Sequence, residues 1–173
     1  QCTDERVNLV TKDLFKKYPN ISSFSKAHQE ELENDIRSTG FFRNKAKSII
    51  NCAKELVEKY DSNIPSDMEK LVKLPGVGRK TANVLLTECY NKPGIIVDTH
   101  FKRLMNRIGL SDEDNADKIE FEINDYITPI DRGIFSHSIT THGRKICNAK
   151  KPICIKCSIK EYCNFYLGGS NKA

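Results

Sequence analysis

The stretch Leu71–His100, LVKLPGVGRKTANVLLTECYNKPGIIVDTH, decides how this chain folds. It predicts a short helix that ends at Pro75, a turn with two glycines, and a second helix whose first turn carries Lys80. Gly76 and Gly78 permit positive φ and leave the backbone of the turn uncovered. The N–H groups there have no helical partners, so the turn is a ready site for an anion such as phosphate. Taken alone, the stretch is equally compatible with an ordinary corner between helices.

Composition and charge are typical of a globular protein that contacts a polyanion. The chain has 173 residues, enough for one core or for two small lobes, and 38% of them are hydrophobic and 29% charged. No stretch approaches the roughly 20 apolar residues that span a membrane. The net charge of +5 is uneven, because residues 144–160 contain six basic residues and no acid, whereas residues 112–125 contain seven acids and one lysine. This asymmetry predicts one face turned toward a polyanion.

The spacing of apolar residues predicts helices, and no alternating pattern indicates a strand. The clearest apolar stripe consists of Ala46, Ile49, Ile50, Ala53, Leu56, Val57 and Tyr60. In the helix after the turn, the buried stripe is expected to comprise Ala82, Leu85, Leu86 and Cys89. Lys80, Asn83 and Thr87 lie off that stripe, so Lys80 is expected to project from the mouth of a buried helix. Further on, Asp98 or Thr99 can cap another helix.

Four of the seven cysteines gather near the C-terminus with the spacing C-x6-C-x2-C-x5-C, namely Cys147, Cys154, Cys157 and Cys163. We expect no secretory signal, and this pattern then favours metal binding over disulfides. Both zinc and a [4Fe–4S] cluster accept four thiolates, and the spacing does not separate them. The loop between the first two cysteines carries Lys150 and Lys151, which suits it to contact a phosphate backbone.

The hairpin motif LPGVGRKTANVLL…VDTH and the cysteine spacing together resemble the endonuclease III family, the bifunctional DNA glycosylase/AP lyases of the helix-hairpin-helix superfamily. The resemblance covers nearly the whole chain. It implies an all-α, two-lobed fold with a six-helix barrel lobe over residues 1–92 and a cluster lobe over residues 93–173, and with DNA across the cleft between them. It also implies that the four cysteines hold a [4Fe–4S] cluster. Chains of the family extend further at the N-terminus, so we expect the natural start to lie before Gln1.

The resemblance assigns roles to individual residues. Lys80 matches the catalytic lysine and Asp98 the catalytic aspartate. The phosphate-binding turn comprises Leu74, Pro75, Gly76, Val77 and Gly78, with Arg79 beside it. Gln1 matches a glutamine that fills the gap left by a flipped base. Phe41 stands where the family usually has a leucine wedge, and its ring can stack on bases instead.

The resemblance implies a base excision repair enzyme that removes oxidised pyrimidines. An amine can attack C1′ of the sugar, expel the base and then permit β-elimination through a Schiff base. The expected partner is double-stranded DNA with damaged bases or abasic sites, bound by a monomer. The expected location is inside the cell: the cytoplasm or nucleoid in a prokaryote, the nucleus or mitochondrion in a eukaryote. Two other hypotheses are a monofunctional mismatch-specific glycosylase, whose relatives have Ser or Tyr at position 80, and a non-catalytic DNA-binding protein with a structural metal.

Overall fold

The computed structural model describes residues 2–168, and within that range every regular element is a helix, which confirms the expected all-α class. The chain divides into two compact units, Gln1–Gly78 and Arg79–Ala173. This division assigns the helix that carries Lys80 to the C-terminal unit. The boundary after residue 92 that was expected from the sequence stays a prediction.

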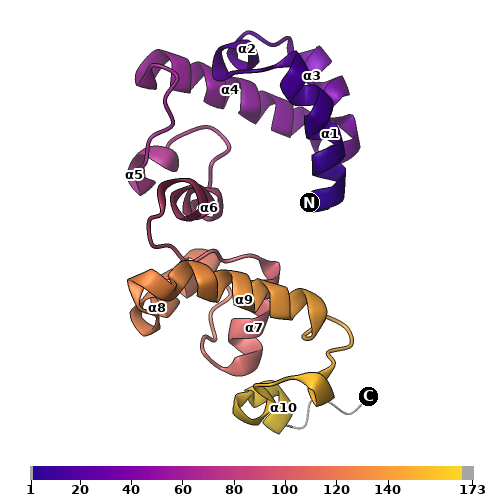
Figure 1. Ribbon diagram of the computed structural model, residues 1–173, viewed down its shortest axis with the longest axis vertical. Helices are drawn as coiled ribbons and strands as arrows, with labels where there is room; N and C mark the ends of the chain where they lie inside the picture. The colour runs from indigo at the N-terminus through magenta and orange to yellow at the C-terminus, as the bar shows by residue number, and fades with distance from the viewer. Residues whose placement is uncertain (1, 169–173) are drawn as a thin grey trace. The chain divides into compact units, whose positions relative to one another are not determined.

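The N-terminal unit is built around one long amphipathic helix. Its elements are α1 (Asp4–Lys17), α2 (Ile21–Ser25), α3 (Gln29–Asp35), the 3-10 helix η1 (Arg37–Thr39), α4 (Phe42–Tyr60) and α5 (Met68–Leu71) (Figure 1). The predicted stripe of α4 is turned inward, since Ala46, Ile50, Ala53 and Leu56 are buried. Leu14 of α1, Tyr18 directly after it and Leu32 of α3 join it in one apolar cluster. At about 25 cal/mol per Å² of apolar area, burial of this kind is what holds such short helices in place.

The C-terminal unit has its own apolar core. Its elements are α6 (Arg79–Tyr90), α7 (Thr99–Ile108), α8 (Ala116–Tyr126), the 3-10 helix η2 (Pro129–Asp131), α9 (Arg132–Lys145), the 3-10 helices η3 (Cys154–Lys156) and η4 (Lys160–Tyr162), and α10 (Asn164–Leu167). Phe101, Leu104 and Met105 of α7 are buried against Ile119 and Ile123 of α8. The extended segment before α7 also enters this core, because Ile95 and Val97 are buried there. This segment leads directly to Asp98.

One expectation about α6 is wrong. Ala82 and Leu86 are buried as predicted, but Cys89 is exposed and Asn83 is only 3% exposed. The buried face of α6 is therefore rotated toward the side that carries Asn83. The reason is a close approach of backbone: a Cβ added at Gly94 would lie 2.7 Å from Oδ1 of Asn83, so the chain packs directly on this amide.

No helix within residues 2–168 is both long enough and apolar enough to cross a membrane.

Candidate active site

The glycine turn is packed tightly against α4. Leu74 is buried, and its carbonyl accepts a hydrogen bond of 3.1 Å from the N–H of Val77, which closes the turn. Gly76 has φ 77°, and a Cβ there would lie 2.6 Å from the Cβ of Ser48. A side chain at this position would meet both backbone strain and a clash. Gly76 is therefore required by the local packing, and Gly78 beside it is exposed.

Lys80 and Asp98 both belong to the C-terminal unit and both stand at helix N-termini. Lys80 is exposed in the first turn of α6, as predicted from the position of the apolar stripe. Asp98 is the N-cap of α7, where its Oδ1 accepts a hydrogen bond of 2.7 Å from the N–H of Phe101. A half-buried carboxylate held by one oxygen leaves the second for chemistry.

Arg79 is tied into the C-terminal unit by a side chain that the sequence did not single out. Its Nε donates to a carboxylate oxygen of Glu120 at 3.0 Å, and its Nη2 donates to the other oxygen. Its guanidinium also lies 4.6 Å from the ring centroid of Phe121. This paired carboxylate raises the pKa of Arg79 further above its usual value. The role of Arg79 in contacting DNA stays a prediction, and the structure adds an anchoring contact to α8.

Phe41 is held outward by an unusual backbone. It follows Gly40, has φ 48° and ψ 29°, and is 66% exposed immediately before α4. Left-handed conformations are uncommon for bulky residues and concentrate at functional sites. A groove beside Phe41 is lined by Asn44, Lys45, Ser48, Ile49 and Gly76. Within the N-terminal unit, the predicted wedge and the glycine turn therefore border one groove. Gln1, the other residue predicted to fill the gap in DNA, lies outside the described residues.

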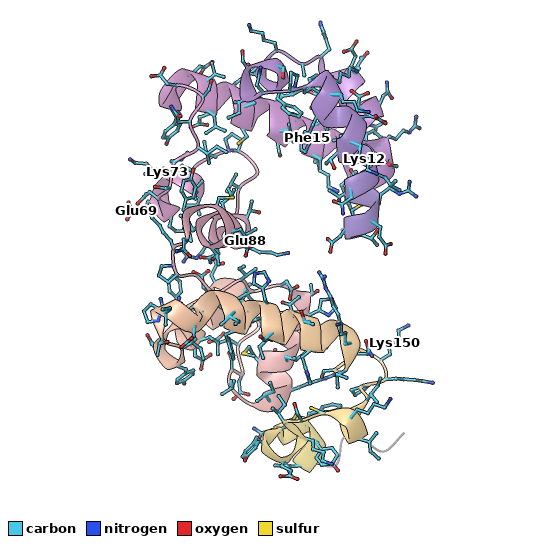
Figure 2. All side chains as sticks on the ribbon, viewed as in Figure 1. Lys12, Phe15, Glu69, Lys73, Glu88 and Lys150 are labelled. Carbon is cyan, nitrogen blue, oxygen red and sulfur yellow. The ribbon has the colours of Figure 1, made fainter. Side chains whose placement is uncertain are left out.

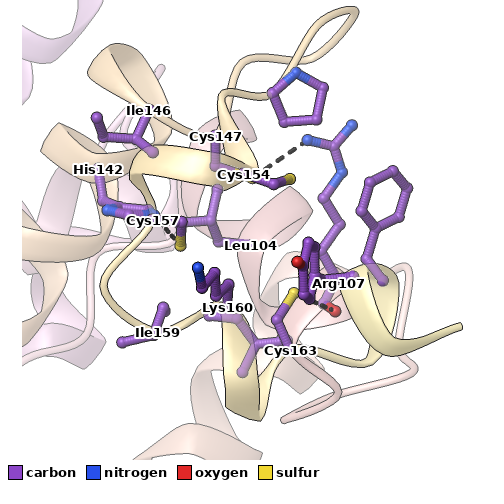
Figure 3. A pocket seen from close by; sticks show the side chains of 14 residues that line it. Leu104, Arg107, His142, Ile146, Cys147, Cys154, Cys157, Ile159, Lys160 and Cys163 are labelled. Carbon is purple, nitrogen blue, oxygen red and sulfur yellow. Dashed lines mark hydrogen bonds between the residues drawn. The ribbon is translucent and has the colours of Figure 1, made fainter. Parts of the chain in front are cut away.

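The four clustered cysteines line a single cavity of the C-terminal unit. Figure 3 shows Cys147, Cys154, Cys157 and Cys163 around it, together with apolar side chains such as Leu104 and Ile146. All four thiols are unpaired. Burial raises the pKa of the Cys157 thiol, and the neighbouring cysteines add to this rise. Among residues 2–168, no group of three or more His, Cys, Asp or Glu side chains is arranged to hold a single metal ion. The four thiols instead stand on the walls of one cavity.

Three contacts from α7 and α9 reach the sulfur atoms, and one of them is the hydrogen bond of 3.2 Å that Sγ of Cys163 donates to the carbonyl oxygen of Arg107. Nη1 of Arg107 lies 3.2 Å from Sγ of Cys147, and Nε2 of His142 lies 3.4 Å from Sγ of Cys157 (Figure 3). Burial lowers the pKa of His142 below its usual value, which favours the neutral imidazole. Arg107 was not among the residues predicted from the sequence, because nothing in local spacing links position 107 to position 147.

Arg107 also organises the loop that carries the two lysines. Its guanidinium donates to the carbonyl oxygens of Asn148 and Ala149, each at 2.8 Å, and stacks 4.6 Å from the ring centroid of Phe165. Lys150 and Lys151 are exposed in the middle of this loop, and Figure 2 shows the side chain of Lys150 extending away from the body of the unit. The loop therefore presents two cations on a fixed backbone.

Comparison with known proteins shows the family to which this chain belongs. Residues 1–129 match the model of the HhH-GPD superfamily of base excision DNA repair proteins. Endonuclease III of Synechocystis is 45% identical over 164 residues, which cover 94% of this chain and 75% of that protein. Endonuclease III of Bacillus subtilis is 40% identical, with 94% of this chain and 75% of that protein covered. The chain belongs to the endonuclease III family.

Solved structures agree with this assignment to the endonuclease III family. A trapped endonuclease III–DNA covalent intermediate, an estranged-adenine complex, superposes with a TM-score of 0.94 at 39% identity, covering 99% of this chain and 81% of that one. A thermostable thymine-DNA glycosylase, at 22% identity and a TM-score of 0.84, shares the fold. The two-lobed glycosylase fold is thus confirmed, and so is the class of enzyme, a DNA glycosylase/AP lyase of base excision repair. This class fits the relatives better than a mismatch-specific glycosylase or a non-catalytic DNA-binding protein.

Proposed function

We propose that this endonuclease III family member removes oxidised pyrimidines from double-stranded DNA with Lys80 as the nucleophile and cleaves the strand afterwards. The observation that carries the proposal is the placement of Lys80, an exposed amine in the first turn of α6, directly after the glycine turn in the chain. An amine is the one side chain type that can both displace the base and form a Schiff base. The protein acts as a monomer, and its bacterial relatives support a place beside the chromosome.

The reaction requires the neutral form of Lys80. Its Nζ attacks C1′ of the sugar, the N-glycosidic bond breaks, and the base leaves with the electron pair and takes up a proton. The sugar ring opens to a Schiff base at C1′, and loss of a C2′ proton then breaks the C3′–O bond. Asp98 offers Oδ2 to stabilise the cationic sugar or to accept a proton.

The DNA backbone would be held by groups that carry no sequence information. The N–H groups of Gly76 and Gly78 in the glycine turn would bind a phosphate, since that of Val77 already donates to Leu74, and the loop lysines Lys150 and Lys151 would add charge. A damaged base must leave the stack before C1′ becomes accessible, which costs a few kcal/mol. Phe41 can occupy the vacated space or stack on a neighbouring base, since its ring already stands free of the core.

We propose further that Cys147, Cys154, Cys157 and Cys163 hold a [4Fe–4S] cluster. The donor set fits, because four unpaired thiols line one largely apolar cavity, and thiolates are the ligands of such clusters. The guanidinium of Arg107, which donates to Sγ of Cys147, would be an outer contact of the cluster. When bound, the cluster supplies four covalent anchors for the C-terminal segment. The loop with Lys150 and Lys151 would then be fixed at both ends.

Borohydride trapping tests the role of Lys80. A duplex with one thymine glycol should yield a covalent protein–DNA adduct in the presence of borohydride and a nicked strand in its absence. Lys80→Gln should abolish both products, whereas Lys118→Gln, an exposed lysine of α8 paired with Glu113, should preserve both. An adduct formed by Lys80→Gln at the wild-type rate would assign the nucleophile elsewhere. For the cluster, protein purified without oxygen should be yellow-brown and contain iron and sulfide, whereas a colourless zinc protein would refute that part.

A further inference from the structure

The extended segment Gly94–Val97 carries Asp98 and is held from two sides by polar side chains that have no other assigned task. On the α6 side, Asn83 lies three residues after Lys80, and thus on the same side of the helix. The carboxamide of Asn83 contacts Gly94 so closely that a Cβ at Gly94 would lie 2.7 Å from Oδ1. The same Cβ would lie 3.1 Å from the hydroxyl of Thr87. The segment therefore starts against the helix that carries the nucleophile.

On the α9 side, Ser136 fixes the middle of the segment. Its hydroxyl accepts a hydrogen bond of 3.0 Å from the N–H of Ile96 and donates one of 2.9 Å to the carbonyl of Arg132. Ser136 is 1% exposed, so this N–H has no access to water as an alternative partner. Ser136 thus fixes the position of the segment relative to α9 at Ile96, two residues before Asp98.

Burial of the Asn83 side chain lowers the free energy of unfolding. It is 3% exposed, and its Nδ2 has no hydrogen-bond partner among the described residues. An unsatisfied buried donor costs about 1–3 kcal/mol, and an apolar side chain of similar volume would avoid that cost. Stability alone therefore gives no reason for an asparagine here. A reason in the reaction is available, because Asn83 connects the helix of Lys80 to the segment of Asp98.

We propose that Asn83 and Ser136 are positioning residues, which fix the segment Gly94–Val97 between α6 and α9 and so set where Asp98 stands relative to Lys80. This inference rests on the proposed function of the two catalytic side chains. Displacement of a catalytic group by about 1 Å costs on the order of 100-fold in rate. Base release needs both Lys80 and Asp98 in place. Condensation with a preformed abasic site, whose aldehyde is already available, depends chiefly on the amine.

The deciding variant is Asn83→Leu, because it separates position from stability. Leucine has the same number and branching of side-chain heavy atoms as asparagine and leaves no polar group unsatisfied, so we expect unfolding by urea to be unchanged or shifted to higher urea. Under single-turnover conditions, we expect release of thymine glycol to slow by about 10- to 100-fold. The rate of borohydride trapping on a preformed abasic site should change by less than about threefold, because this reaction depends chiefly on the amine. Ser136→Ala should also lower base release more than trapping, and Ser138→Ala, an exposed serine of the same helix, should change neither.

The outcomes are distinct. If Asn83→Leu is folded and releases the base at the wild-type rate, the positioning role is wrong. If both reactions of Asn83→Leu fall by the same factor, Asn83 supports the unit as a whole, and the proposal is equally overturned. Wild-type protein in the same assay tests the underlying function separately, because a wild type that neither releases the base nor forms an adduct would refute the proposed function.

Discussion

The guanidinium of Arg79 and the carboxylate of Glu120 form a bidentate ion pair, which joins the first residue of α6 to the middle of α8. The side chain of Glu120 is 6% exposed and that of Arg79 is 26% exposed. Such a pair is far less screened by water than the surface pairs of this chain. Since Lys80 is the next residue, the pair fixes the start of the helix on which the nucleophile stands.

Glu120→Gln is expected to destabilise the protein by about 3–5 kcal/mol, because it leaves a partly buried guanidinium without its counter-charge. Urea denaturation measures this directly. The matched control is Glu113→Gln, which breaks the exposed pair with Lys118 and should cost no more than about 1 kcal/mol. Equal shifts for the two variants would show that the Arg79–Glu120 pair adds nothing beyond a surface pair.

Phe41→Gly should move stability and DNA affinity in opposite directions. Glycine relieves a left-handed backbone that costs about 1–2 kcal/mol in other residues, so the midpoint of unfolding should rise. Loss of the ring removes a stacking contact worth about 1–3 kcal/mol, so lesion DNA should bind more weakly. Fluorescence anisotropy and thermal unfolding report the two effects. Phe41→Leu retains the strain and should leave the midpoint unchanged; unaltered affinity in Phe41→Gly would exclude Phe41 from the interface.

The loop lysines are expected to contribute electrostatically. If Lys150 and Lys151 each contact a phosphate, replacing both with Gln should make the slope of log affinity against log salt shallower by about 1.8, at about 0.9 per contact. The titration is run on duplexes with and without a lesion, and the change should be the same for both, since phosphate contacts carry no sequence information. Lys12→Gln, an exposed lysine of α1, serves as the comparison. A slope that stays constant in the double variant would remove these lysines from the interface.

Arg107→Lys should weaken retention of the proposed cluster. The forked donation to Cys147 and to the carbonyls of Asn148 and Ala149 cannot be reproduced by a single ammonium. Loss of such outer contacts typically lowers metal affinity by about 10- to 100-fold. Iron lost to a chelator over time gives the measurement. Lys102→Met changes an exposed ion pair on the same helix and should retain iron like the wild type; equal rates for Arg107→Lys would contradict the assignment.

Much of this site could be predicted from local sequence. Periodicity predicted the inward face of α4 and the outward position of Lys80, and side-chain chemistry predicted Asp98 as a cap. These features depend on neighbours within a turn of helix. The cysteine spacing likewise predicted the four residues that line one cavity, because their separation along the chain limits how far apart they can lie.

The remaining features depend on partners distant in sequence. Arg79 finds Glu120 after 41 residues, and Arg107 finds Cys147 after 40. No spacing rule reaches that far. A signal for Glu120 was nevertheless present, because it follows Ile119 and lies three residues before Ile123 on the buried side of α8. The rotated face of α6 was missed for a different reason: the close approach of Gly94 gives Asn83 a buried place that hydrophobicity alone assigns to Cys89.

Helix α7 joins two ends of the C-terminal unit that would otherwise be independent. Its N-cap is Asp98 and its last turn holds Arg107, and its ten residues span about 15 Å. A straight helix of this length has no internal joint. A rotation that released the guanidinium from the cysteine loop would also turn the carboxylate at the opposite end. Substitutions in α7 therefore affect both of its ends. A substitution that preserves the contacts of Arg107 with the cysteine loop must also preserve the position of Asp98, so the two ends are constrained to evolve together.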